Sequence, residues 1–185
     1  MNGKAEIRGN AKFSHKKYYP IRKLIFSPFG SFKMLKEKMH ADMCIEYVGS
    51  VLKQGDLQPA LVCSEAPFTV AAYSDEMDAV VMLEFPKELR EQYGLHVGDR
   101  LVTSVGYLEG VDVSLAPDIF PGEGFTRNYA EFVPIVQLFL ASDEEKAMAR
   151  TAEFDEVHWQ KVERLASSYA KEHPDLKRDG FFYFK

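Results

Sequence analysis

The segment Phe68–Phe85, with the sequence FTVAAYSDEMDAVVMLEF, decides the fold class of this chain. Its two apolar runs, Phe68–Ser74 and Ala79–Phe85, are joined by the acidic turn Asp75–Asp78. Short apolar runs that flank a tight polar turn are typical of a β-hairpin. We therefore predict a pair of antiparallel strands in the middle of the chain.

Further short strands are predicted on both sides of this hairpin. They cover Cys44–Lys53, which ends at the turn signal Gln54-Gly55-Asp56, and then Ala60–Ser64, Arg100–Leu108 and Glu131–Leu140. Pro134 in the last strand favours an edge position or a bulge, because proline cannot donate a hydrogen bond to a neighbouring strand. A short helix is predicted between Pro86 and Gly94. Since short strands joined by turns favour antiparallel pairing, we expect a β-core across residues 44–140.

The residues after this core are predicted to be helical. Ser142 with Glu145 forms a capping-box pattern for a short helix. A longer helix is predicted from Asp155 to Glu172, with an apolar stripe at Trp159, Val162, Ala166 and Tyr169. The aromatic end, Phe181–Phe184, is expected to form a terminal strand or a docked tail, because exposed aromatic runs promote aggregation. The predicted fold is α+β: a small antiparallel β-sheet or barrel-like core with C-terminal helices packed on it.

A strong charge asymmetry sets the first part of the chain apart from the rest. Residues 1–38 hold ten basic and two acidic side chains, whereas the remaining residues hold 13 basic and 26 acidic ones. We expect residues 1–12, which are polar and show no periodicity, to be disordered. Residues 13–43 are then a basic aromatic arm with a short helix from Phe32 to Met39. Residues 44–185 are expected to form a single α+β domain, with its helices in 142–173.

The one positive functional signal lies in this arm, where basic and aromatic side chains interleave. The candidate contacts for an anionic partner are Lys16, Lys17, Tyr18, Tyr19, Arg22 and Lys23. Bases neutralise phosphate groups, while aromatic rings stack on nucleobases or lie at a membrane surface. The same pattern is also typical of an arm whose rings dock on its own domain and leave the lysines in water. Both interpretations remain open.

No pattern in the chain identifies a catalytic, cofactor or metal site, so we expect no catalytic residue, no cofactor and no metal ligand set. The five histidines lack the paired spacing of a zinc site, and no Gly-rich phosphate loop opens a helix. Cys44 and Cys63 are expected to be inert thiols in the core. Asp112, Asp118 and Glu123 share the long loop 109–128, where a ligand site or an active site is most easily accommodated.

The first residues and the apolar runs of the chain indicate the cellular compartment of the protein. The first ten residues lack the apolar stretch of a secretory signal. The run Phe132–Ala141 is too short and too interrupted to cross a bilayer. We therefore expect a cytoplasmic protein without a transmembrane segment.

The order of several features resembles an uncharacterised bacterial domain family of unknown function. These features are a Gly- and Pro-marked strand pair, the turn Val97–Arg100 that leads into a strand, the Pro-bearing strand around Phe132-Val133-Pro134, and the helix around Trp159. The resemblance covers about residues 44–170. It implies a small β-core with helices, and it implies no activity and no site residues.

Three functional hypotheses follow from these patterns. The first is a non-enzymatic protein-interaction or regulatory domain, whose partner is a second copy of the chain or another protein. The second is a small-ligand binder or an enzyme that uses the loop 109–128. The third is a nucleic-acid or anionic-surface binder that acts through residues 13–38, with affinity that falls steeply with salt.

Overall fold

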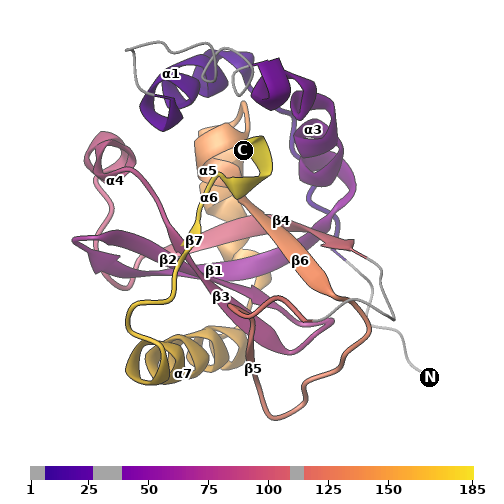
Figure 1. Cartoon of the computed structure of the whole chain (residues 1–185), viewed down its shortest axis with the longest axis vertical. Coiled ribbons are helices and arrows are strands. Elements are labelled where there is room, and N and C mark those ends of the chain that lie inside the picture. Colours follow the sequence, from indigo (N-terminus) through magenta and orange to yellow (C-terminus); the bar gives the residue numbers. More distant parts are fainter. Residues whose placement is uncertain (1–6, 27–38, 109–114) are drawn as a thin grey trace.

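The computed structural model describes residues 7–26, 39–108 and 115–185 of the chain (Figure 1). It has an α+β fold, in which an antiparallel sheet curls into a half-barrel between helices. The predicted fold class is therefore confirmed. The helix predicted from Phe32 to Met39 falls, apart from its last residue, outside the described residues.

Seven strands form one sheet within these described ranges. They are β1 (Asp56–Glu65), β2 (Phe68–Ser74), β3 (Ala79–Glu84), β4 (Arg100–Leu108), β5 (Phe120–Pro121), β6 (Glu131–Val136) and β7 (Arg178–Asp179). The strand order is β5-β3-β2-β1-β4-β6 with antiparallel neighbours, and β7 pairs parallel with β3. The predicted hairpin is β2 with β3. Pro134 lies in β6 at the end of this order, the edge position that its missing N–H favours.

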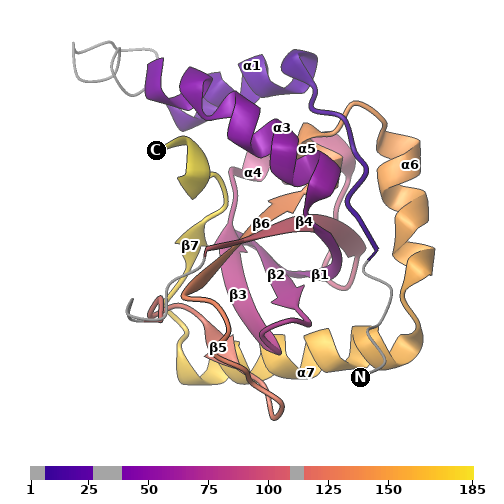
Figure 2. The same ribbon diagram turned by 90° about the vertical axis from the view of Figure 1, so that its right-hand side faces the viewer.

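The helices lie on both sides of this sheet. They are α1 (His15–Ile25), α3 (Ile45–Gln54), α4 (Lys87–Tyr93), α5 (Gln137–Leu140), α6 (Glu144–Ala149) and α7 (Glu156–Glu172), with 3-10 turns at Arg150–Glu153 and Phe182–Phe184. Figures 1 and 2 show α7 across one face of the sheet and α1, α3 and α5 on the opposite side. Of the helices that the structure describes, none combines the length and the apolar composition that crossing a bilayer requires.

Side-chain alternation in the central strands explains why both faces of the sheet are covered. Val70 and Ala72 of β2 belong to the large core on the side of α1, α3 and α5, whereas Ala71 and Tyr73 pack with α7. Successive side chains of a strand point to opposite faces. Because every residue of β2 is buried, this strand needs an apolar layer on each side.

The strand predicted at Cys44–Lys53 is wrong, because this segment forms helix α3. Its buried residues Val48, Val51 and Leu52 recur at the spacing of one helix face. The β-branched side chains of the segment favour a strand when they are considered alone, but the burial of this face determines the conformation. The predicted turn Gln54-Gly55-Asp56 is therefore the end of a helix, and the β-core begins at residue 56 rather than 44.

Two boundaries after the sheet also differ from the prediction. The strand predicted to reach Leu140 ends at Val136, where the single turn of α5 begins. Helix α6 is capped by Asp143, whose side chain accepts a hydrogen bond from the Lys146 N–H at 2.9 Å, and not by Ser142. Both differences place a helical turn where the chain leaves the sheet.

The terminal strand predicted at Phe181–Phe184 is wrong as well. The pairing of β7 with β3 ends at Asp179, and the aromatic residues after it form a 3-10 turn. Phe181 and Phe184 are 1% and 0% exposed within the large core. Three of the four aromatic side chains are thus buried without forming a strand, and the described chain ends in a docked tail.

Residues 7–14, called the N-terminal strap below, lie against the domain, so the expected disorder is wrong for residues 7–12. The Ile7 carbonyl oxygen accepts a hydrogen bond from the Leu57 N–H at 2.7 Å, and Phe13 forms a β-bridge with Ala141. The strap leads directly into α1. The position of that helix therefore depends on how firmly the strap is held.

Buried tyrosines predict a loss of stability at alkaline pH. Burial raises the pKa of Tyr169 to about 12, and burial with the nearby Asp78 raises the pKa of Tyr73 further. A tyrosine whose folded pKa exceeds its unfolded value of about 10 contributes stability below about pH 10 that is lost as the pH rises through the folded pKa. The contribution of these tyrosines to the free energy of unfolding, measured by urea unfolding, is expected to be constant up to about pH 10 and to fall above it. A free energy of unfolding that does not fall above about pH 10 would contradict this.

Candidate functional site between α1 and α4

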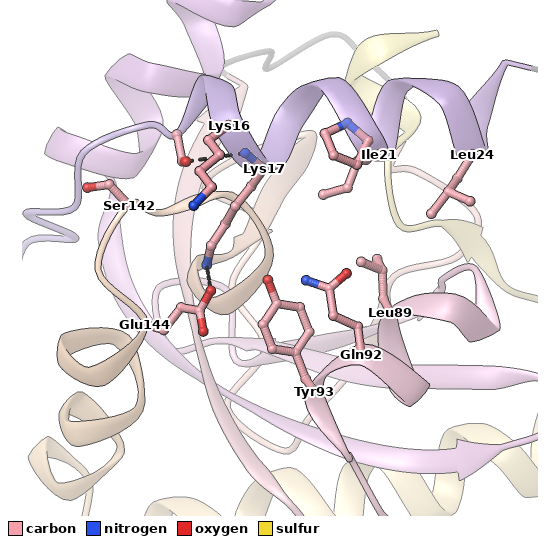
Figure 3. Close-up of a pocket in the computed structure, with 11 residues that line it drawn as sticks. Lys16, Lys17, Ile21, Leu24, Leu89, Gln92, Tyr93, Ser142 and Glu144 are labelled. Atoms are coloured by element: carbon pink, nitrogen blue, oxygen red, sulfur yellow. Dashed lines mark hydrogen bonds and ion pairs between the residues drawn. The ribbon is translucent and has the colours of Figure 1, made fainter.

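A hollow cleft lies beneath α1. Its cavity of about 400 Å³ is bounded by α1, by α4 and by the start of α6 (Figure 3). The lining side chains are Ser14, Lys16, Lys17, Pro20, Ile21, Leu24, Leu89, Gln92, Tyr93, Ser142 and Glu144. The lysines, serines and glutamate gather at one end, and the aliphatic side chains lie at the other. The cleft therefore has a polar end and an apolar end.

Helix α1 is placed over the cleft by its buried face. Ser14 caps the helix by accepting a hydrogen bond from the Lys17 N–H at 3.3 Å. Tyr18 and Ile21 are 0% and 2% exposed, and the Tyr18 hydroxyl donates to Asp42 at 2.8 Å. Because these two residues are three positions apart, they mark one face of the helix. Ile21 and the α1 residues beside this face line the cleft.

Lys17 occupies the polar end of the cleft. Its ammonium group donates to the Leu138 carbonyl oxygen at 2.6 Å and pairs with Glu144 Oε1 at 3.0 Å. It also lies 5.4 Å from the centre of the Tyr93 ring. Burial lowers the pKa of Lys17, and the hydrogen bond with Glu144 opposes this shift. The place that a cation would take, between a carboxylate and an aromatic ring, is thus filled by the chain itself.

Three other polar side chains face the cleft. Figure 3 shows the Gln92 carboxamide and the Tyr93 hydroxyl pointing from α4 toward α1, where Lys16 lies on the opposite wall. Within the part of the chain that the structure describes, none of these three polar groups forms a hydrogen bond or an ion pair. Burial raises the pKa of Tyr93 to about 12, so its hydroxyl remains protonated at neutral pH. The cleft therefore presents N–H and O–H donors that are available to a ligand.

The apolar end of the cleft has a partly exposed wall. Ile21 of α1 and Leu89 of α4 are 2% and 1% exposed, and they line this end from opposite walls as part of the large core. Leu24, in contrast, is 42% exposed at the rim. A ligand that covers Leu24 would remove apolar surface from water, which favours binding by about 25 cal/mol for each Å².

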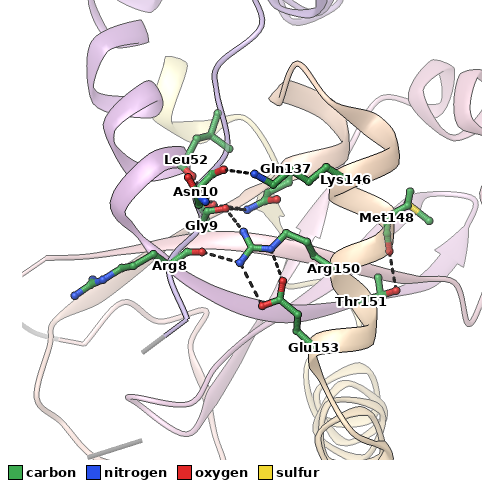
Figure 4. A network of polar contacts seen from close by, with 11 residues as sticks. Arg8, Gly9, Asn10, Leu52, Gln137, Lys146, Met148, Arg150, Thr151 and Glu153 are labelled. Carbon is green, nitrogen blue, oxygen red and sulfur yellow. Dashed lines mark hydrogen bonds and ion pairs between the residues drawn. The ribbon is translucent and has the colours of Figure 1, made fainter. Parts of the chain in front are cut away.

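A buried arginine fastens the strap that carries α1. Arg150, which is 9% exposed, donates to the carbonyl oxygens of Arg8, at 2.7 Å, and of Gly9 (Figure 4). Its Nε donates to Glu153 at 2.6 Å, and Gln137 donates to the same Gly9 carbonyl oxygen at 2.9 Å. A Cβ atom on Gly9 would collide with the Ser104 side chain and with the Leu52 carbonyl oxygen. The network therefore fixes the strap, and through it the wall of the cleft that α1 supplies.

The structure brings together two of the six residues predicted to contact an anionic partner. Lys16 and Lys17 both line the cleft. Tyr18 and Arg22 instead bind Asp42, each at 2.8 Å, and so hold α1 to the domain. The other two, Tyr19 and Lys23, are exposed on α1 and do not line the cleft.

Gln92, Tyr93 and Glu144 are cleft residues that no pattern in the sequence indicates. Their helices α4 and α6 were expected, but no local pattern indicates that α1 lies over both. Lys17 and its acceptor Leu138 are 121 positions apart, so the contact depends on the tertiary fold. The available signal was Tyr93 itself, an aromatic side chain at the end of a short polar helix.

The acidic loop residues considered as a second site do not converge. Asp118 is bound by Arg178 at 2.6 Å, and Glu123 is exposed, 3.8 Å from Arg164. Asp112 lies outside the described residues. Among the residues that the structure does describe, no group of three His, Cys, Asp or Glu side chains is placed to hold a metal ion.

The two cysteines are free and only partly buried. Cys44 lies before α3 rather than in a strand, with its Sγ 3.7 Å from His40 Nε2, and burial raises its pKa. Burial also raises the pKa of Cys63, in β1, to about 11. Since the thiolate is the reactive form, neither position favours a nucleophile.

No family model matches the chain, and no curated protein or solved structure matches it either. The geometry of the cleft is therefore the basis for a functional assignment.

Proposed function

We propose that the protein is a non-enzymatic recognition domain that binds a small organic carboxylate in the cleft between α1 and α4. The observation that carries this proposal is the convergence of Lys16, Gln92 and Tyr93 on the polar end of a cavity whose other end is apolar. Cavities of about 300–1,000 Å³ with apolar walls and a few polar groups are typical of small-molecule sites. The volume of about 400 Å³ lies in this range.

The charges around the cleft support an anionic ligand. Among the side chains that line the cleft, Lys17 and Glu144 form an ion pair with each other, so Lys16 contributes a positive charge that no lining carboxylate balances. A carboxylate accepts several hydrogen bonds at once, and bonds to charged donors are the strongest of this kind. A cationic ligand, in contrast, would have to displace the Lys17 ammonium group.

The remaining groups suit binding better than catalysis. Tyr93, with a pKa of about 12, is a hydrogen-bond donor and not a base at neutral pH. The amine of Lys17 is held by the Leu138 carbonyl oxygen and by Glu144, which leaves it poorly placed as a nucleophile. These features support recognition without a chemical step.

4-Phenylbutyrate, a carboxylate with an apolar end, serves as the test ligand. Substitution of Lys16 by alanine is expected to weaken its binding by about tenfold, the effect of losing one charge-assisted hydrogen bond. Titration calorimetry on the full chain would measure the dissociation constant. A set of aliphatic and aromatic monocarboxylates, with the matching primary amides as neutral analogues, would define the ligand class. The amides are expected to bind weakly, because they lack the negative charge.

Lys23→Ala is the matched control, since Lys23 lies on the same helix, is exposed and does not line the cleft. It is expected to leave the affinity unchanged. Equal losses in the two variants would indicate a general effect of positive charge on α1 and would contradict the proposed site. Such losses, with oligonucleotide binding that falls steeply with salt, would favour the nucleic-acid alternative for residues 13–38.

A further inference from the structure

A second cavity lies next to the first, on the other side of Leu24. It has a volume of about 400 Å³, and its lining includes Leu24, Ile25, Phe85, Pro86 and Phe181. Leu24 lines both cavities. The rim residue of the first cavity is therefore the boundary between two neighbouring hollows.

Both cavities lie between the same two parts of the chain. α1 supplies one wall of each, and the segment 84–93, which runs from the end of β3 through α4, supplies part of the other. The α1 residues that line them extend from Lys16 to Ile25, which corresponds to about 14 Å along a helix axis. An extended peptide of about four residues has the same length.

The second cavity differs from the first in its chemistry. Its lining combines the apolar side chains of Ile25, Phe85 and Phe181 with two side chains of opposite charge, Glu84 and Lys177. Its remaining charged residues, Asp179 and Lys185, are paired with each other. A simple alkyl chain would offer no hydrogen-bonding group to the exposed Glu84 carboxylate. A peptide offers both apolar side chains and backbone N–H and C=O groups.

We infer that the ligand of this site is the carboxy-terminal tail of a partner protein, about four residues long and apolar near its end. This inference rests on the proposed carboxylate site. The terminal carboxylate binds Lys16, Gln92 and Tyr93, and apolar side chains near the end of the tail cover Leu24. The preceding residues continue along α1 into the second cavity. The positive charge at one end of the cleft fixes the direction of the chain.

Fluorescence anisotropy with fluorescein-labelled peptide pools tests the inference. The pools are randomised at four positions, end in leucine and carry either a free or an amidated carboxy terminus. The free pool is expected to bind the full-length protein, and amidation or Lys16→Ala is expected to weaken binding at least tenfold. Equal binding of the free and amidated pools would overturn the inference, and this comparison requires no variant to fold.

Glu84→Trp separates the two cavities, because Glu84 is exposed and lines only the second one. An indole at this position is expected to weaken peptide binding and to leave the binding of 4-phenylbutyrate unchanged. Glu88→Trp, an exposed position on α4 that lines neither cavity, is the control. If 4-phenylbutyrate binds and no peptide pool does, the inference is wrong while the proposed function stands. If neither ligand binds, both are wrong.

Discussion

Substitution of Arg178 by methionine is expected to lower the free energy of unfolding by about 3–5 kcal/mol. The side chain of Arg178 is 6% exposed and forms ion pairs with Asp118, at 2.6 Å, and with Glu131, at 2.9 Å. It also donates to the Phe132 carbonyl oxygen at 3.0 Å. Methionine retains much of the volume but leaves two carboxylates and a buried carbonyl oxygen without their donor.

The size of this effect follows from where Arg178 lies. It belongs to β7, which pairs with β3, whereas Glu131 and Phe132 belong to β6 at the far end of the strand order. The guanidinium group thus connects β7 and β6, two strands of the half-barrel that are not paired with each other in this sheet. Urea denaturation would measure the loss as a lower midpoint with an unchanged slope.

Arg164→Met is the control for this substitution. Arg164 and Glu123 are 3.8 Å apart, with side chains that are 58% and 88% exposed. An exposed ion pair of this kind contributes at most about 1 kcal/mol. A loss for Arg178→Met that is no larger than the loss for Arg164→Met would mean that the β6–β7 contact does not stabilise the fold.

Substitution of Arg150 by methionine is expected to cost about 2–4 kcal/mol and to weaken ligand binding in the cleft. The change removes the donor to the Arg8 carbonyl oxygen and one of the two donors to the Gly9 carbonyl oxygen. It also leaves Glu153 without its partner. Because the strap leads into α1, a looser strap is expected to displace Lys16 from the cleft.

Hydrogen exchange would test the second part of this prediction. Amides of residues 9–14 are expected to exchange faster in Arg150→Met, while those of β2 stay protected in proportion to the remaining global stability. Lys146→Met is the control, since the side chain of Lys146 contacts the same strap through an exposed hydrogen bond to the Asn10 carbonyl oxygen, at 3.1 Å. Unchanged exchange in the strap of Arg150→Met would show that other contacts hold it.

The sequence predicted those parts of the fold that depend on local patterns. The β2–β3 hairpin and helix α7 have clear periodicity, and Asp155 and Gly94 mark helix ends by their own side-chain or backbone properties. Gly94, for example, adopts a φ of +60°, which glycine adopts without strain. These features require no knowledge of the rest of the chain.

The segments that were predicted wrongly depend on tertiary contacts. α3 contains β-branched residues that favour a strand, and only its packing against the domain makes it a helix. The strap is polar and lacks a period, yet Arg150 and Gln137 order it from far along the chain. The cleft shows the same dependence on tertiary structure. Its two lysines could be identified from the composition of the sequence, whereas Gln92 and Tyr93 become candidates only when the position of α1 over α4 is known.

The hydrogen bonds between Arg150 and the strap have a consequence for folding during synthesis on the ribosome. Arg8 and Arg150 are 142 positions apart, and translation at about 5–20 residues per second separates their appearance by roughly 7–28 s. During that interval the hairpin of β2 and β3 can form, whereas Tyr18 and Ile21 have no complete surface to cover. The nascent protein therefore forms this hairpin before its cleft, and a chain arrested short of residue 150 would display the apolar face of α1 to chaperones.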